Sequence, residues 1–130
     1  MQKTIYMLED DQDDRLLTDE IMDDLALPVT IRYFSNSVEL TEAMEKELPS
    51  LVLMDFNAPP SGALAAIREI RKTVSSHVPL VILTESKTNA NRDACYREGA
   101  SSVITKPTTM EATKKRVEGF FRYWLEVAEI

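Results

Sequence analysis

Cysteine is almost absent from this chain, since Cys95 is the only one among its 130 residues. An internal disulfide and every metal motif built from several cysteines are therefore excluded. Long apolar runs are lacking as well, and none approaches the roughly 20 residues of a membrane-spanning helix. The N-terminus has neither the basic region nor the long apolar region of a signal peptide. Together these absences predict a protein of the reducing cytoplasm that has no place in a membrane.

Basic charge is scarce: 15 Lys and Arg stand against 22 Asp and Glu, which leaves a net charge of −7. With a pI near 4.7, the chain lacks the basic face that phosphate binding needs, so nucleic acid is excluded as a partner. Glycine is scarce too, with three residues, and we find no repeat and no Gly/Ser-rich linker. The length suits one domain that buries a substantial core, so we expect residues 1–130 to fold as a unit.

Acidic residues gather in the stretch "YMLEDDQDDRLL" at residues 6–17. Like charges at about 4 Å repel by roughly 4 kcal/mol at an effective dielectric near 20, so the chain must gain something from the cluster. Asp13 and Asp14 are expected to cap the helix that follows and to favour its dipole. The acids before them need another explanation.

Five short apolar runs predict β-strands. Most have the continuous apolar character of strands buried on both faces, as in a parallel sheet, whereas the second alternates and is predicted to be a half-exposed edge. The runs are Ile5–Leu8, Val29–Phe34, Leu51–Met54, Leu80–Leu83 and Ser102–Thr105.

Helical periodicity fills the segments between and after these runs. We expect Ser37 to cap the second helix, Gly99 to end a fourth helix over residues 89–98, and Thr108 with Glu111 to form a capping box for the fifth. The apolar positions at helical spacing are Leu17, Ile21 and Leu25, then Leu40 and Met44, then Leu64, Ile67 and Ile70, and finally Val117, Phe121, Trp124 and Ala128. The resulting (βα)₅ order predicts an α/β fold with one doubly wound parallel sheet and right-handed crossovers.

Polar residues follow the predicted strands at the edge where their carboxyl ends meet. Such an edge is where open α/β sheets bind ligands. Three carboxylates, one hydroxyl and one ammonium group suit a magnesium ion together with a phosphoryl group. These residues are Glu9 and Asp10 after the first run, Asp55 after the third, Thr84 after the fourth and Lys106 after the fifth.

The segments "YMLEDD", "LVLMDFNAPP", "VILTES" and "VITKP" occur in an order that resembles the receiver domain of two-component response regulators. The resemblance runs along the whole chain and implies the flavodoxin-like strand order 2-1-3-4-5. It also implies that Asp55 is the phosphoacceptor and that Glu9 and Asp10 hold Mg²⁺ with the backbone carbonyl of Asn57. Thr84 would be the switch hydroxyl. Lys106 would bind phosphate and would precede a cis peptide bond to Pro107.

A receiver domain accepts a phosphoryl group from a histidine kinase or a phosphotransfer protein and passes the signal to a downstream protein. It is not an enzyme in the usual sense, because at most it catalyses its own phosphorylation and dephosphorylation. Nothing in the sequence after the fifth helix suggests an output domain, so we expect a stand-alone receiver or a piece of a longer chain. The two ends of the sequence resemble single-domain regulators paired with bacterial phytochrome-type histidine kinases.

The sequence departs from the receiver pattern at three positions. Val103 stands where the family usually has a switch aromatic, three residues before the lysine, and Glu85 stands where a small residue usually follows the switch hydroxyl. Gly62 is seven residues past Asp55, one fewer than is common. These departures favour an alternative: a degenerate receiver that acts as a phosphorylation-independent interaction module. A phosphatase of the haloacid dehalogenase type is a weaker alternative, because its D-x-D pattern at Asp11 is followed by Arg15 rather than Thr or Val.

The fifth predicted helix has more aromatic residues than one buried stripe can hold. Phe120 lies one position off that stripe, and Tyr123 lies about 100° from Trp124 around the helix. An exposed apolar patch commonly marks an interface. The sequence therefore predicts a homodimer through this helix.

Overall fold

The structure, a computed structural model, describes residues 3–85, 88–105 and 109–127. Five parallel strands form one sheet in the order β2-β1-β3-β4-β5. The predicted flavodoxin-like receiver fold is therefore confirmed. The strands are β1 (Lys3–Leu8), β2 (Val29–Phe34), β3 (Leu51–Asp55), β4 (Leu80–Thr84) and β5 (Ser102–Thr105).

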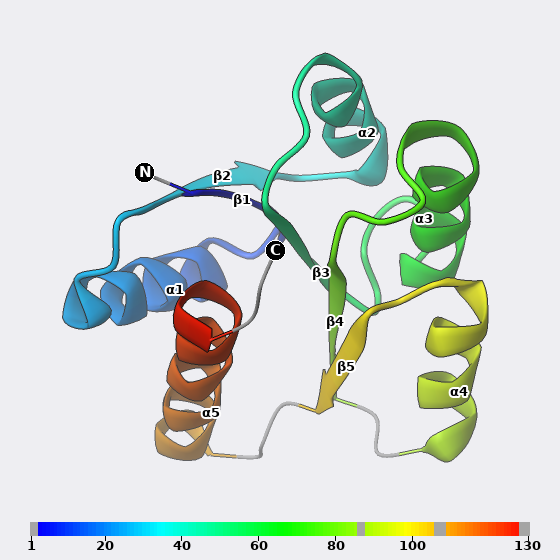
Figure 1. Cartoon of the computed structure of the whole chain (residues 1–130). Coiled ribbons are helices and arrows are strands. Elements are labelled where there is room, and N and C mark those ends of the chain that lie inside the picture. Colours follow the sequence, from blue (N-terminus) through cyan, green and yellow to red (C-terminus); the bar gives the residue numbers. More distant parts are fainter. Residues whose placement is uncertain (1–2, 86–87, 106–108, 128–130) are drawn as a thin grey trace.

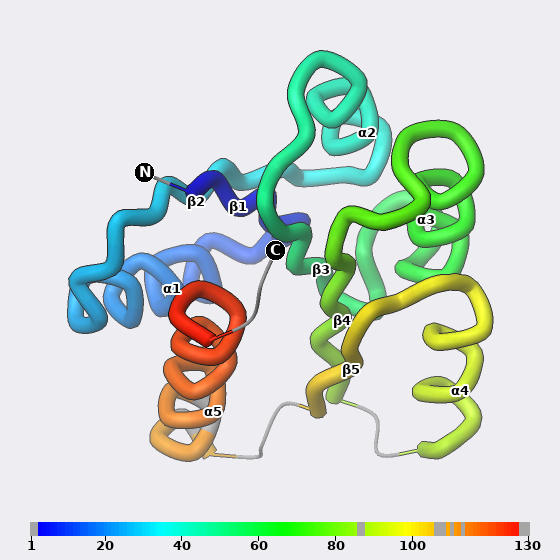
Figure 2. The backbone as a smooth tube through the Cα atoms, in the orientation of Figure 1, coloured from blue at the N-terminus to red at the C-terminus, as the bar shows by residue number. Residues whose placement is uncertain are grey.

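Helices cover both faces of the sheet, with α1 and α5 on one side and α2, α3 and α4 on the other (Figures 1 and 2). None of the helices in the described part of the chain is long and apolar enough to cross a membrane. The helices are α1 (Gln12–Leu25), α2 (Ser37–Lys46), α3 (Ala63–Glu69), α4 (Asn89–Glu98) and α5 (Met110–Arg122), and π-helical turns η1 (Ile70–Val74) and η2 (Tyr123–Val127) continue α3 and α5.

The sheet separates two apolar cores, because successive side chains of a strand point to opposite faces. Along β1, Tyr6 and Leu8 pack toward α2 and α3, whereas Ile5 and Met7 pack toward α1 and α5. Strands β3 and β4 are buried on both faces and therefore read as continuous apolar runs. The alternating β2 is an edge strand, as predicted.

Two of the predicted helix caps are displaced by one residue. Asn36 caps α2, since its side chain accepts a hydrogen bond from the Glu39 amide at 2.9 Å, while the Ser37 amide donates to the Pro59 carbonyl. Thr109 caps α5 through the Ala112 amide, whereas Thr108 lies outside the described residues. Because the neighbouring residues have similar capping ability, the sequence does not decide which of them is the N-cap, and the path of the chain in the folded protein does. Gly99 ends α4 with a left-handed φ of 117°, as predicted.

The start of α1 corrects another expectation. The N-cap is Asp11, whose carboxylate accepts from the amides of Asp13 and Asp14 at 2.8 and 3.1 Å. Asp13 and Asp14 therefore lie in the first turn, where negative charge still favours the helix dipole. The prediction that Asp13 and Asp14 cap the helix was therefore wrong, because the cap lies two and three residues before them.

One aromatic residue of the last helix, Phe120, is more deeply buried than predicted. Phe120 is only 7% exposed and packs beside Phe121 in the core between the sheet and α1, so it does not belong to an exposed patch. Because α5 packs against α1 as well as against side chains of the sheet, its buried face is wider than one stripe. Tyr123 is 53% exposed and contacts Trp124 edge-on. Ala128 lies outside the described residues.

Candidate functional site

The register of the sheet brings the predicted site residues to one edge. Leu8 of β1 pairs with Met54 of β3, so Glu9 and Asp10 leave β1 beside Asp55. Asp55 in turn pairs with Leu83 of β4, which places Thr84 one residue beyond it. Three neighbouring strands therefore bring their polar ends to one place, as the sequence predicted. Lys106 and its peptide to Pro107 lie outside the described residues, so their roles stay predictions.

Glu9 is held more firmly than a surface acid. It is only 4% exposed, and its amide donates to the Phe34 carbonyl at the end of β2. Its Oε2 atom accepts from the Asp11 amide at 3.3 Å. Asp10, between them, is exposed. In the turn from β1 into α1, hydrogen bonds therefore hold the backbone at Glu9 and at Asp11, and the Asp10 carboxylate between them is accessible to solvent.

The loop after Asp55 folds back toward the end of β3. The Ala58 amide donates to the Asp55 carbonyl at 3.0 Å, and the Ala63 amide donates to the Phe56 carbonyl at 2.9 Å. Gly62 precedes α3 with a φ of 87°, a conformation that favours glycine. The shortened segment therefore still closes a compact loop. Asn57 lies in this loop and is exposed.

Two of the departures from the receiver pattern, Glu85 and Val103, lie at β4 and β5. Thr84 is only 3% exposed, whereas Glu85, the next residue, is exposed. The side chain of Val103 is half-buried against the core beneath α2, α3 and α4. Sequence reasoning missed Tyr96 of α4, whose hydroxyl accepts from the Val103 amide at 3.1 Å. An aromatic residue thus contacts position 103 from a neighbouring element.

Arg15 is a second residue that sequence reasoning missed. Its Nε atom donates to the Glu9 carbonyl at 2.7 Å, and its Nη2 atom donates to Ser35 Oγ at 3.1 Å. Its guanidinium lies 5.2 Å from the centre of the Tyr33 ring. The sequence feature that could have identified Arg15 is its position as a basic residue within a run of acids, in the first turn of the helix that follows the predicted site.

The donor chemistry at this edge fits a hard divalent cation. Within residues 3–85, 88–105 and 109–127, no three His, Cys, Asp or Glu side chains form a ready-made metal-binding group. Mg²⁺ does not need such a cage, because it is usually bound through one or two carboxylates and keeps several waters. Asp10 and Asp55, with Glu9 behind them, can supply those carboxylates.

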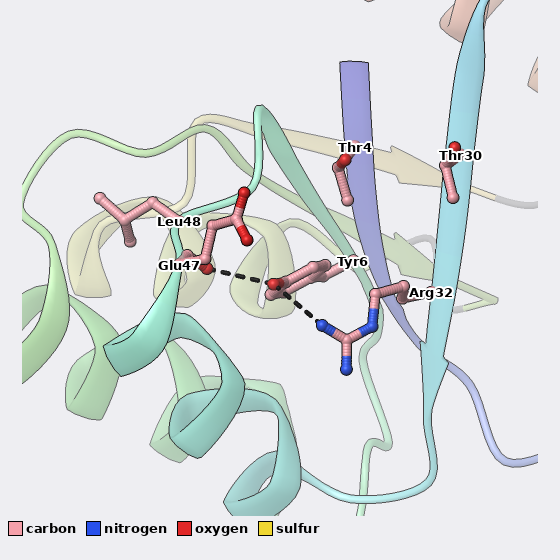
Figure 3. Close-up of a pocket in the computed structure, with 6 residues that line it drawn as sticks. All are labelled: Thr4, Tyr6, Thr30, Arg32, Glu47 and Leu48. Carbon is pink, nitrogen blue, oxygen red and sulfur yellow. Dashed lines mark hydrogen bonds between the residues drawn. The ribbon is translucent and has the colours of Figure 1, made fainter. Parts of the chain in front are cut away.

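A separate hollow of about 280 Å³ lies elsewhere on the sheet (Figure 3). Its lining includes Thr4 and Thr30, from the first halves of β1 and β2, so it is remote from the strand ends that carry the acids. Within it the Tyr6 hydroxyl donates to the Glu47 carbonyl at 3.1 Å and accepts from Arg32 at 3.3 Å. The hollow is therefore not part of the candidate site.

Residues 5–118 match the family model of the response regulator receiver domain. This chain belongs to that family. It is 28% identical over 124 residues to the transcriptional regulatory protein CrdR of Helicobacter pylori, a match that covers 93% of this chain and 56% of CrdR. It therefore spans little more than half the length of that relative.

Response regulator Rcp1 of Synechocystis is 22% identical over 136 residues, which cover 98% of this receiver domain and 92% of Rcp1. The crystal structure of Rcp1 with bound Mn²⁺ has a TM-score of 0.87 at 23% identity, with 98% of each chain covered. Phosphorylated RcpA, a cyanobacterial phytochrome response regulator, has a TM-score of 0.86 at 23% identity, covering 99% of this chain and 98% of RcpA. These likenesses confirm the fold.

Proposed function

We propose that this receiver domain accepts a phosphoryl group on Asp55 from a histidine kinase or a phosphotransfer protein, with Mg²⁺ as cofactor. The observation that carries the proposal is the register, which puts Asp55 between the strand end of Glu9 and Asp10 and the strand end of Thr84. The likeness to metal-bound Rcp1 and to phosphorylated RcpA supports it. The protein then signals by a change of its interaction surface.

Phosphoryl transfer depends mainly on alignment and charge neutralisation, so it needs little covalent chemistry from the protein. A carboxylate oxygen of Asp55 attacks phosphorus, the phosphorus–nitrogen bond to the donor histidine breaks, and the bonding electron pair leaves with the imidazole, which takes up a proton. Bound Mg²⁺ would neutralise charge on the phosphoryl oxygens. Asp10 and Glu9 would hold the Mg²⁺ ion. The Thr84 hydroxyl and the Lys106 ammonium group would bind the remaining phosphoryl oxygens.

Intact-protein mass spectrometry after incubation with acetyl phosphate and Mg²⁺ tests this proposal. Wild type should gain about 80 Da, the mass of one phosphoryl group, and Asp55→Asn should gain none. Asp23→Asn is a matched control, because Asp23 is an exposed acid on α1, and it should label like wild type. Labelling of Asp55→Asn to the wild-type extent would overturn the assignment.

A second candidate function is a degenerate receiver that binds partners without being phosphorylated. Glu85 favours it, because an exposed acid beside Thr84 repels a phosphoryl group, and so does the absence of a ring at Val103. The same experiment separates the two functions. Wild type that takes up no phosphoryl group, yet binds its kinase equally well with and without acetyl phosphate, would favour the degenerate receiver.

The partners follow from the proposed role. A downstream protein of unknown identity should read the phosphorylated surface, and the likeness to RcpA supports a phytochrome-type histidine kinase as the donor. We place this exchange in the cytoplasm, where histidine kinases present their phosphohistidine. A homodimer through α5 and its continuation η2 remains part of the proposal, with Tyr123 at the start of η2 as an exposed aromatic residue. Turnover of an external substrate is not expected of such a signalling domain.

A further inference from the structure

Arg15 connects three segments at the acidic edge of the sheet. From the first turn of α1 it reaches the Glu9 carbonyl at the end of β1 through Nε, at 2.7 Å. It reaches Ser35, just past the end of β2, through Nη2 at 3.1 Å. The Tyr33 hydroxyl lies 3.1 Å from the Arg15 carbonyl, but its one hydrogen is shared with the shorter bond to Asp19 Oδ1 at 2.6 Å. The side chain of Arg15 is therefore what ties this residue to the ends of β1 and β2.

The bond to Glu9 acts directly on Asp10. The Glu9 carbonyl and the Asp10 nitrogen belong to one planar peptide unit, so a donor that holds the oxygen also fixes the direction in which Asp10 leaves the strand. On the other side of Glu9, the amide is held by the Phe34 carbonyl at 3.0 Å. The backbone before Asp10 thus has little freedom to rotate.

The guanidinium is itself held in one orientation. It lies 5.2 Å from the centre of the Tyr33 ring, and the Tyr33 hydroxyl is fixed by a 2.6 Å bond to Asp19 Oδ1. A planar group with donors on two edges can stack on a ring and hold two oxygens at once, which an ammonium group cannot do. The arrangement is therefore specific to arginine rather than to positive charge.

We propose that Arg15 is a positioning residue for the metal site, which holds the Glu9–Asp10 peptide so that the Asp10 carboxylate is already oriented for a divalent cation. This inference rests on the proposed function, since it concerns the same site. A purely electrostatic role would have the opposite sign, because a cation beside the acids repels Mg²⁺ and its removal would tighten binding. Residues that orient metal ligands typically change affinity by about 10–100-fold when they are replaced.

The experiment is a Mg²⁺ titration of the whole chain, followed by the backbone amide signals of residues 9–11 and 55–58 in two-dimensional NMR spectra. Wild type is compared with Arg15→Lys, which keeps the charge, and with Arg15→Gln, which removes it. Both variants should bind Mg²⁺ about tenfold more weakly or worse. Ser35→Ala removes only the Nη2 contact, so it should show a smaller loss in the same direction and remains informative if Arg15→Gln fails to fold.

Each outcome decides the inference. Weaker binding by both Arg15 variants, with spectra that retain the native dispersion of signals, supports positioning. Wild-type affinity in Arg15→Lys together with tighter binding in Arg15→Gln would show a charge effect and overturn it. If these results accompany normal labelling of Asp55, only the inference fails. If wild type neither binds Mg²⁺ nor labels, the proposed function fails with it.

Discussion

The side chain of Arg71 occupies the space where a β-carbon of residue 99 would lie. A Cβ built on Gly99 would come within 2.8 Å of Arg71 Cγ, and Arg71 Nε donates to the Gly99 carbonyl at 2.8 Å. The guanidinium also bonds the Val78 carbonyl at 2.7 Å and contacts Ser101 Oγ. Partial burial lowers the pKa of Arg71, which nevertheless stays charged at neutral pH. This contact joins η1 to the turn between α4 and β5.

Gly99→Ala should therefore reduce the free energy of unfolding by roughly 1–3 kcal/mol, because alanine is strained at a φ of 117° and its methyl group collides with Arg71. Urea unfolding followed by circular dichroism measures the change. Gly119→Ala is the matched control. In the described part of the chain, a β-carbon at residue 119 would meet no atom within 4 Å beyond the backbone of its own helix, so this substitution should stabilise α5 by about 0.5–1 kcal/mol. Equal effects of the two substitutions would contradict the proposed role of the contact.

Tyr33 should remain protonated in alkaline solution after an exposed tyrosine has ionised. Burial, and then the hydrogen bond to Asp19, raise the pKa of Tyr33 well above its ordinary value. A raised folded-state pKa means that the contribution of Tyr33 to stability is complete below pH of about 10 and is lost as the pH rises from there toward the folded-state pKa. Tyr33→Phe should be less stable than wild type by about 1 kcal/mol at pH 8. The difference should shrink above pH 10 in denaturant titrations, and a constant difference would refute the assignment.

Mg²⁺ should stabilise the folded chain, because it binds the folded site and not the unfolded chain. A tenfold excess over its Kd would add about 1.4 kcal/mol to the free energy of unfolding. Thermal melts in EDTA and in millimolar Mg²⁺ measure the effect. Asp10→Asn should abolish the difference, whereas Asp23→Asn, on the exposed side of α1, should retain it. A melting temperature of wild type that is identical in both buffers would count against the site.

Tyr123→Glu should weaken self-association by about tenfold or more, since an exposed aromatic residue at the centre of an interface commonly dominates its affinity. Sedimentation of both proteins, with and without a phosphoryl mimic and Mg²⁺, measures the association. Val38→Glu is the control, because Val38 is equally exposed but lies on α2, across the sheet from α5. A wild type that stays monomeric at high micromolar concentration in both states would remove the dimer from the proposal.

Local sequence pattern determined much of this fold. Buried parallel strands must be apolar on both faces, so β1, β3 and β4 were visible as runs, and the polar residue after each run marked the sheet edge. Asp55, Glu9, Asp10 and Thr84 were found in this way. The spatial order of the strands did not follow from the runs themselves and came from the resemblance to receiver domains.

The tertiary structure decided the contacts between elements distant in sequence. Periodicity reports which side of a helix is apolar, but the burial of Phe120 depends on α1 lying beside α5. Likewise, nothing near Arg15 in sequence shows that β2 will end within reach of its guanidinium, or that Gly99 will face Arg71. Long flexible side chains take the partners that the assembled fold provides. Local sequence alone therefore determined the acids of the candidate site, whereas only the packed sheet and helices determined what holds them in place.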